Sequence, residues 1–153
     1  MTPHPFTIDE YVRWSDVDKA GIIFYGAYVR FIEIAETELF RAAGMPYGEV
    51  FDRFDIWLPR VHLEVDFAYP ARLDDALTVA AYFTGIGRTS LRLAFEVMLR
   101  DSCRLTASGH EVLVATSQSD LAPRPVPDGL RELLEPFTLE RDRARALLGI
   151  VES

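Results

Sequence analysis

The chain passes from a polar turn into a long helix within residues 14–43, which have the sequence WSDVDKAGIIFYGAYVRFIEIAETELFRAA. The apolar residues that recur at helical spacing on one face are Tyr28, Phe31, Ile32, Ala35, Leu39 and Phe40. This periodicity predicts an amphipathic helix over residues 27–43. Gly44 and Pro46 follow it as a stop signal. We expect the apolar face to be buried against a sheet.

Three glutamates accompany this helix. By the same helical count, Glu36 and Glu38 lie off the apolar face, so both are predicted to be solvated. Glu33 comes one position after Ile32 and is close enough to the apolar face to reach a pocket. Glu33 is therefore the helix carboxylate with a predicted role in a site.

The rest of the chain is dominated by strand patterns. Val61, Leu63, Val65 and Phe67 alternate with polar residues and predict a half-buried strand. Further strands are predicted over residues 6–14, 76–85, 90–100 and 105–117, and short helices over 129–136 and 138–149. Consecutive strands joined by short turns pair antiparallel. The predicted fold class is α+β, with one helix packed on a five-stranded sheet, and the second sheet face predicts dimerisation or higher assembly.

Composition bounds the possible functions. The chain has 153 residues, of which 49% are hydrophobic and 26% charged, as expected for one soluble domain. Its net charge of −8 argues against a general nucleic-acid binder, and an anionic substrate would need a local basic patch. We expect no transmembrane helix and no signal peptide. Cys103 is the single cysteine, which excludes an internal disulfide and fits a reducing cytoplasm.

Several site chemistries are not predicted. His4, His62 and His110 are scattered along the sequence without cysteine partners, so no metal site is expected. Ala20 and Ala27 stand where a calcium loop beginning at Asp16 would need oxygen ligands. The sequence also lacks a Gly-x-Ser-x-Gly elbow and a Walker A loop.

Two aspartates just ahead of the helix remain as candidates for chemistry. Asp16 and Asp18 either form a plain polar turn, or one of them faces a cleft at the helix N-terminus. Free backbone N–H groups at such a terminus can hold a polarised carbonyl next to the carboxylate. From the residues alone, both alternatives stay open.

Three motifs carry a resemblance to a known family. The first is Asp16-x-Asp18-x-Ala20-Gly21-Ile22-x-x-Tyr25-x-x-Tyr28, followed by Phe31-x-Glu33-x-Ala35. The second is Pro70-Ala71-Arg72-x-Asp74-Asp75, and the third is Gly87-Arg88-x-Ser90-Leu91. In this order they resemble the 4-hydroxybenzoyl-CoA thioesterase family, over about residues 8–127. The branch that includes the Tol-Pal-associated thioesterases is the most similar.

The resemblance implies a hotdog fold, in which an antiparallel sheet wraps a long central helix. It implies one thioesterase domain over residues 1–136, with residues 137–153 as a C-terminal extension of it. The implied enzyme hydrolyses an acyl-CoA or aromatic acyl-CoA to free acid and CoA, without a cofactor or metal. We expect it to be cytoplasmic and to form a homodimer or homotetramer, because the family's active site lies at a dimer interface.

The resemblance also implies roles for individual residues. Asp18 corresponds to the family's catalytic carboxylate, acting as nucleophile or general base. The backbone N–H of Tyr25 corresponds to the donor to the thioester carbonyl. Relatives commonly carry Asn or Ser where this chain has Ala27, and Ala cannot cap a helix. Gly26 is the alternative cap.

Substrate contacts are implied at two further places. Glu33 corresponds to the family's acidic residue near the acyl group, and Arg88, with Thr89 and Ser90, to a turn that binds CoA phosphates. The competing hypothesis is a non-catalytic hotdog module that binds acyl-CoA or acyl carrier protein. Such a module would be expected to lack the carboxylate at position 18. A hotdog dehydratase would need a histidine ahead of the helix, and residues 5–61 contain none.

Overall fold

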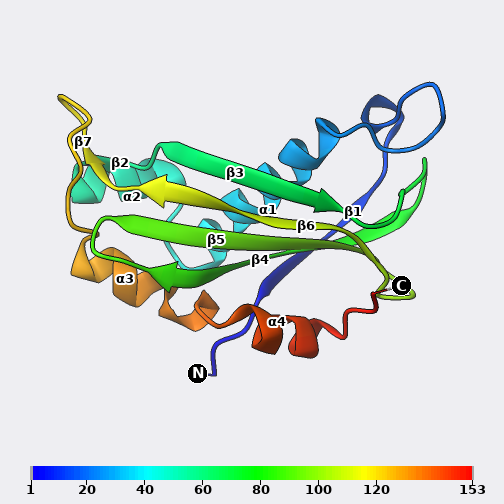
Figure 1. Ribbon diagram of the computed structural model, residues 1–153. Helices are drawn as coiled ribbons and strands as arrows, with labels where there is room; N and C mark the ends of the chain where they lie inside the picture. The colour runs from blue at the N-terminus through cyan, green and yellow to red at the C-terminus, as the bar shows by residue number, and fades with distance from the viewer. Residues whose placement is uncertain (1, 153) are drawn as a thin grey trace.

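A five-stranded antiparallel sheet packs against one long helix in the computed structural model, which describes residues 2–152 (Figure 1). The strands are β1 (Phe6–Tyr11), β3 (Arg60–Phe67), β4 (Ala76–Ile86), β5 (Ser90–Leu99) and β6 (Leu105–Val114). Their order across the sheet is β1-β4-β5-β6-β3. A separate short pair joins β2 (Ile56–Trp57) to β7 (Thr116–Ser117). The α+β prediction is therefore confirmed.

The long helix α1 (Ala27–Ala42) forms the core with one face of the sheet. All six residues of the predicted apolar face are buried, and all of them except Ile32 belong to the core cluster that includes inward side chains of β4, β5 and β6. Burying one such side chain contributes about 1.5–3 kcal/mol, so this face accounts for much of the driving force. The helix ends just before Gly44, whose φ of +99° suits glycine.

Shorter helices surround this core. They are η1 (Trp14–Asp16), α2 (Tyr47–Phe54), α3 (Asp128–Leu134), η2 (Glu135–Phe137) and α4 (Arg141–Leu148). Within residues 2–152, no helix is long and apolar enough to cross a membrane.

The C-terminal helix α4 covers part of the other sheet face (Figure 1). Ala144 is fully buried against Tyr82 and Ala94. Beside it, Glu96 is only 1% exposed and accepts hydrogen bonds from Arg145 and from the Tyr82 hydroxyl. The sequence of this segment predicts little core contribution because its charges dominate. Ala144 and the Glu96–Arg145 ion pair attach it to the sheet, together with backbone hydrogen bonds from Leu139 to Phe83 and from Val151 to Cys103.

The edge strand β3 differs from its prediction. The alternation predicts a half-buried strand, but Val61, Leu63 and Phe67 are 62%, 45% and 59% exposed. The segment does form a strand, as predicted. Because β3 is at the edge of the sheet, the rest of the chain covers these apolar side chains only partly. The predicted strand over 6–14 is also shorter, ending at Tyr11.

Candidate active site

The two candidate aspartates ahead of α1 have different environments. Asp16 is buried, and its carboxylate accepts the Arg13 backbone N–H at 2.8 Å. Both of its oxygens also accept hydrogen bonds from Nη2 of Arg30, at 2.8 and 2.6 Å. A carboxylate with this many donors is already satisfied. Asp16 therefore fixes the loop onto the first turns of α1.

Asp18 lies at the exposed tip of the same loop. Its Oδ1 accepts the Ala20 backbone N–H at 2.8 Å, and its carbonyl accepts the N–H of Gly21 at 2.9 Å. Gly21 has a φ of +77°, which a glycine adopts without strain. Apart from the Ala20 contact, the side chain has no hydrogen bond within residues 2–152. Asp18 thus presents a fixed carboxylate with a free oxygen.

The start of α1 has no side-chain cap. Gly26 is the N-cap residue, as expected from Ala27, and the turn is closed by the Ala27 N–H donating to the Phe24 carbonyl at 3.0 Å. Between residues 2 and 152 no acceptor is found for the backbone N–H of Tyr25 or Gly26. Unpaired amides at a helix start carry partial positive charge and suit an oxyanion.

A mostly apolar hollow of about 320 Å³ lies beside this helix start. Tyr25, whose side chain is 81% exposed, lines it together with Tyr28 and with Phe67 at the end of β3. Asp18 is not among its lining residues. Within one chain, the carboxylate is therefore near the helix start but outside the hollow.

Arg88, Thr89 and Ser90 lie at the opposite end of the sheet. The loop that holds Asp18 follows β1, whose last residue pairs with the first residue of β4. Arg88 comes two residues after the other end of β4, a strand of 11 residues that spans about 35 Å. The turn is closed by the Gly87 N–H donating to the Ser90 carbonyl at 2.8 Å, and Arg88 is exposed. One chain does not bring this turn to Asp18.

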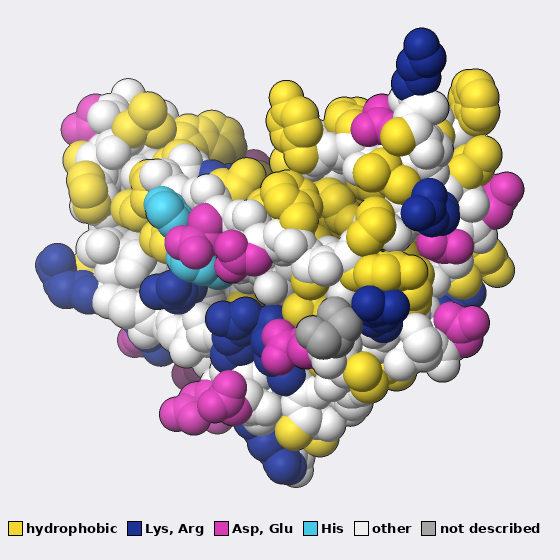
Figure 2. All heavy atoms as spheres, turned by 45° about the vertical axis from the view of Figure 1, so that its right-hand side comes forward, with side chains coloured by type: hydrophobic (Ala, Val, Ile, Leu, Met, Phe, Trp, Pro, Cys, Tyr) yellow, Lys and Arg dark blue, Asp and Glu magenta, His cyan; other side chains and the backbone are white. Residues whose placement is uncertain are grey.

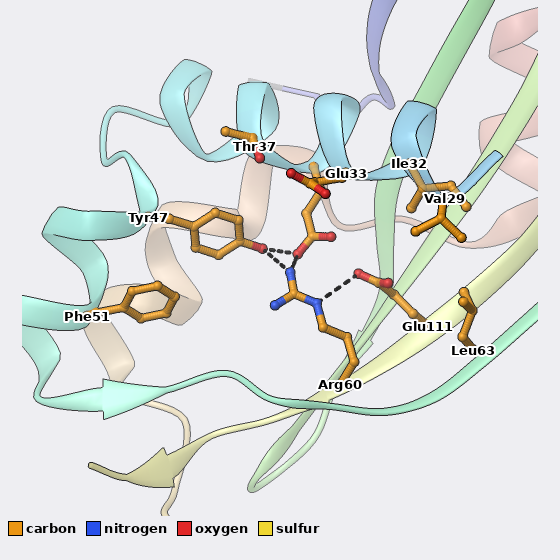
Figure 3. A pocket seen from close by; sticks show the side chains of 10 residues that line it. Val29, Ile32, Glu33, Thr37, Tyr47, Phe51, Arg60, Leu63 and Glu111 are labelled. Carbon is orange, nitrogen blue, oxygen red and sulfur yellow. Dashed lines mark hydrogen bonds and ion pairs between the residues drawn. The ribbon is translucent and has the colours of Figure 1, made fainter. Parts of the chain in front are cut away.

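A second cavity, of about 490 Å³, follows α1 toward its C-terminal end (Figure 3). Val29, Glu33 and Glu36 contribute from successive turns of the helix, so this wall is about 10 Å long. Leu63 of β3 and Phe51 of α2 line the other sides. Glu33 thus reaches a cavity, and the cavity begins about one turn beyond the helix start.

Two buried carboxylates meet at the inner wall of this cavity. Glu36 is 2% exposed and Glu111 is 6% exposed. Glu36 accepts hydrogen bonds from the Tyr47 hydroxyl and from Arg60, whose Nε lies 3.6 Å from Glu111 Oε1 (Figure 3). Burial, reinforced by hydrogen bonding to Glu36, raises the pKa of Glu111 to about 8. The raised pKa favours the protonated form of Glu111 at neutral pH, and Glu36 forms an ion pair with Arg60.

The burial of Glu36 contradicts the prediction that it is solvated. Glu36 lies four residues after Ile32 and four before Phe40, so i,i+4 spacing places it at the margin of the buried face. Glu111 lies two residues before Leu113 and shares its inward side of β6, so strand alternation is a signal of its burial that the sequence predictions did not use. The partner Arg60 could not be found from sequence, because it approaches from another strand.

The histidines are also closer together than the sequence suggests. His62 and His110 are strand residues, as predicted, but neighbouring strands bring their ring centroids to 5.3 Å. Their separation along the chain gave no sign of this proximity. Neither lines the hollow or the second cavity.

A central helix with an uncapped start, a nearby carboxylate and a surrounding sheet define the class of hotdog-fold thioesterases. The chain belongs to the Thioesterase superfamily, whose family model matches residues 20–103. This confirms the family and the fold expected from the three motifs.

Individual relatives agree with this membership. The chain is 26% identical to 1,4-dihydroxy-2-naphthoyl-CoA hydrolase of Synechocystis sp., over 80% of this chain and 90% of the relative. It is 28% identical to the acyl-CoA thioester hydrolase YbgC of Escherichia coli, over 78% and 87%. A mutant 4-hydroxybenzoyl-CoA thioesterase, solved with 4-hydroxybenzoyl-CoA, superposes with a TM-score of 0.76 at 22% identity, over 86% and 99%.

Proposed function

We propose that the chain hydrolyses the thioester of an acyl-CoA or aromatic acyl-CoA, giving the free acid and CoA. The observation that carries the proposal is the fixed carboxylate of Asp18 ahead of a helix whose first amides are unpaired. Membership of the Thioesterase superfamily supports the reaction class. The hydrolases named among the relatives act on CoA thioesters, including aromatic ones.

In this proposal the helix start holds the thioester carbonyl. The Tyr25 N–H donates to the carbonyl oxygen and stabilises the negative charge that develops on it during attack. As a nucleophile, Asp18 would bond to the carbonyl carbon, expel the CoA thiolate and leave a mixed anhydride for water to hydrolyse. As a general base, Asp18 would instead take a proton from the attacking water. Thiolate is a good leaving group, so neither route requires a separate acid.

The acyl group would extend along α1 into the cavity lined by Val29 and Glu33. This direction leads away from the exposed loop and toward mostly apolar walls. Cavities of a few hundred Å³ enclose ligands of this size. Glu33 would lie beside the acyl group, as the family resemblance implies.

The CoA phosphates would bind to Arg88, with Thr89 and Ser90, on a second copy of the chain. Asp18 and Arg88 lie beyond opposite ends of β4, which is about 35 Å long. Because one chain does not unite them, we propose a homodimer or homotetramer with composite sites. Edge strand β3, with exposed Val61 and Leu63, is the surface for such an association.

Two further assignments accompany this proposal. We place one domain over residues 1–136, with residues 137–153 as its extension, because α4 packs on the same sheet as the rest. We retain the cytoplasm as the expected compartment.

The decisive experiment is a thiol-release assay with aliphatic, benzoyl and naphthoyl CoA esters. Asp18→Asn should lower kcat by about 10²–10⁴, the usual contribution of a positioned base or nucleophile. The asparagine keeps an oxygen that can accept the Ala20 N–H, so the loop should retain its shape. Asp52→Asn, at an exposed position of α2, is the matched control and should leave the rate unchanged.

A near-normal rate for Asp18→Asn would reject the assignment of Asp18. If the wild-type protein binds acyl-CoA but releases no thiol with any ester, the non-catalytic binding module is the better description.

A further inference from the structure

A second cluster of polar side chains lies on the sheet face opposite α1. His62 and Glu64 are two residues apart on β3 and therefore point to the same side. Glu64 is directly paired with His110 of β6. Histidine side chains gather against acidic ones on this surface (Figure 2). The three residues take no part in the proposed hydrolysis.

The ligand atoms of the cluster already have nearly the spacing of a coordination sphere. Glu64 Oε1 lies 3.1 Å from Nε2 of His62 and 3.6 Å from Nε2 of His110. Tetrahedral Zn²⁺ with bonds of about 2.1 Å places neighbouring ligand atoms about 3.4 Å apart. The three ligand atoms all lie within 4.8 Å of one another. His62 is half exposed, so a small rotation of its ring can bring its ligand nitrogen to the required distance from that of His110.

We propose that His62, Glu64 and His110 form a binding site for a divalent first-row transition metal ion, with Zn²⁺ as the representative. Two imidazole nitrogens and one carboxylate oxygen are a donor set that suits such ions. Two hydrogen-bonded strands hold the backbone of all three residues. The fourth position opens to solvent, where water completes the coordination. The bound ion would link edge strand β3 to β6.

Two neighbouring arginines, Arg92 and Arg141, carry positive charge that opposes a bound ion, and Arg92 directly contacts a ligand residue. Arg92 Nη2 lies 3.3 Å from Nδ1 of His110. When Nε2 binds a metal, Nδ1 carries the proton and needs an acceptor, which a guanidinium cannot provide. Arg92 must turn away and also repels the ion. Arg92→Gln removes the charge and offers an amide oxygen, so it should tighten binding by about tenfold or more.

The test is calorimetric titration of Zn²⁺ into the tag-free, chelator-treated full-length protein, with Co²⁺ absorption as a spectroscopic signature. We expect one ion per chain in the wild type. His62→Ala and Glu64→Gln should each weaken binding by at least about tenfold, since even outer-sphere changes have effects of 10–100-fold. His4→Ala removes the remaining histidine and should change nothing.

Thermal unfolding gives a second measurement. Zn²⁺ should raise Tm in the wild type and in Arg92→Gln, but not in His62→Ala, whose exposed side chain should not affect folding by itself. Absence of binding in the wild type would overturn the proposal. Equal affinity in the wild type and in His62→Ala and Glu64→Gln would also overturn it, showing adventitious surface binding only. The thiol-release assay is unaffected by either result.

Discussion

The carboxylate of Asp16 and the guanidinium of Arg30 form a bidentate ion pair between the loop ahead of α1 and the helix itself. Nη2 of Arg30 lies 2.6 and 2.8 Å from the two carboxylate oxygens, and Asp16 is almost fully buried. A bidentate pair fixes the relative orientation of its two side chains and also stabilises their contact. It therefore holds in place the turn on which Asp18 is presented.

Arg30→Ala should destabilise the protein by about 1–3 kcal/mol, because it leaves the Asp16 carboxylate buried without its main partner. Chemical denaturation measures the loss. Arg41→Ala is the control, since the exposed Arg41–Glu38 pair should contribute below about 1 kcal/mol. The same loss for both variants would mean that the Asp16–Arg30 pair adds no special stability.

Tyr25 should act through its backbone and not its hydroxyl. We expect Tyr25→Phe to keep kcat within about twofold of the wild type, because it preserves the N–H that faces the oxyanion. Tyr25→Pro removes this N–H and should lower kcat by about 10²–10³, the usual effect of losing one oxyanion donor. Both variants are to be compared by circular dichroism first. A large loss of kcat in folded Tyr25→Phe would instead assign the role to the phenol.

Glu111 should make the folded state less stable as pH rises. Its pKa is about 8 in the folded protein and about 4.5 when unfolded, so between these values only the folded state keeps the proton. Stability is then lost as pH rises through this window. Glu111→Gln should flatten the profile and gain about 1 kcal/mol or more near pH 8, since one pKa unit corresponds to about 1.4 kcal/mol.

Urea unfolding at pH 5, 7 and 8.5 measures this effect. Glu49→Gln, at an exposed site of α2, serves as the control, and its free energy of unfolding should change with pH as that of the wild type does. Parallel profiles for Glu111→Gln and the wild type would show that Glu111 ionises normally in the fold.

Arg88→Ala should raise KM for CoA esters by about tenfold or more, because a hydrogen bond to a charged group contributes about 1.5–3 kcal/mol. A pantetheine ester lacks the nucleotide phosphates and should show little change. Losses of equal size on both substrates would argue against a phosphate contact.

Mixing variants tests whether sites are shared between copies. After exchange of subunits, Asp18→Asn and Arg88→Ala chains should regain activity together, because their mixed dimer holds one site with both residues intact. If the mixture shows only the average of the two separate activities, Asp18 and Arg88 do not cooperate across chains.

Local patterns in the sequence predicted the elements but not all of their surroundings. The helix was predictable because Phe31, Ala35 and Leu39 repeat at its period. The exposure of Val61 was not, because an alternating pattern does not show whether the chain covers that face. The burial of Glu36 depends on Tyr47 and Arg60, which reach it from other elements.

The candidate site likewise has some features that the sequence predicts and others that depend on the folded structure. Motif order indicated Asp18, but which aspartate is already satisfied depends on Arg30, fourteen residues further along the chain. The separation of Asp18 from Arg88 follows from strand length and register, which the motifs do not carry. The proximity of His62 to His110 likewise arises only from the pairing of β3 with β6.

The uncapped start of α1 has a consequence for attempts to engineer this protein. A side-chain cap at Gly26 would stabilise the helix by only about a few tenths of a kcal/mol. Its Cβ would lie 2.9 Å from the Phe24 ring, so the turn that presents the Tyr25 N–H to the thioester would have to shift. Selection for heat resistance alone should therefore favour variants at this position that turn over slowly. At this helix end, durability and speed are competing properties of the same turn.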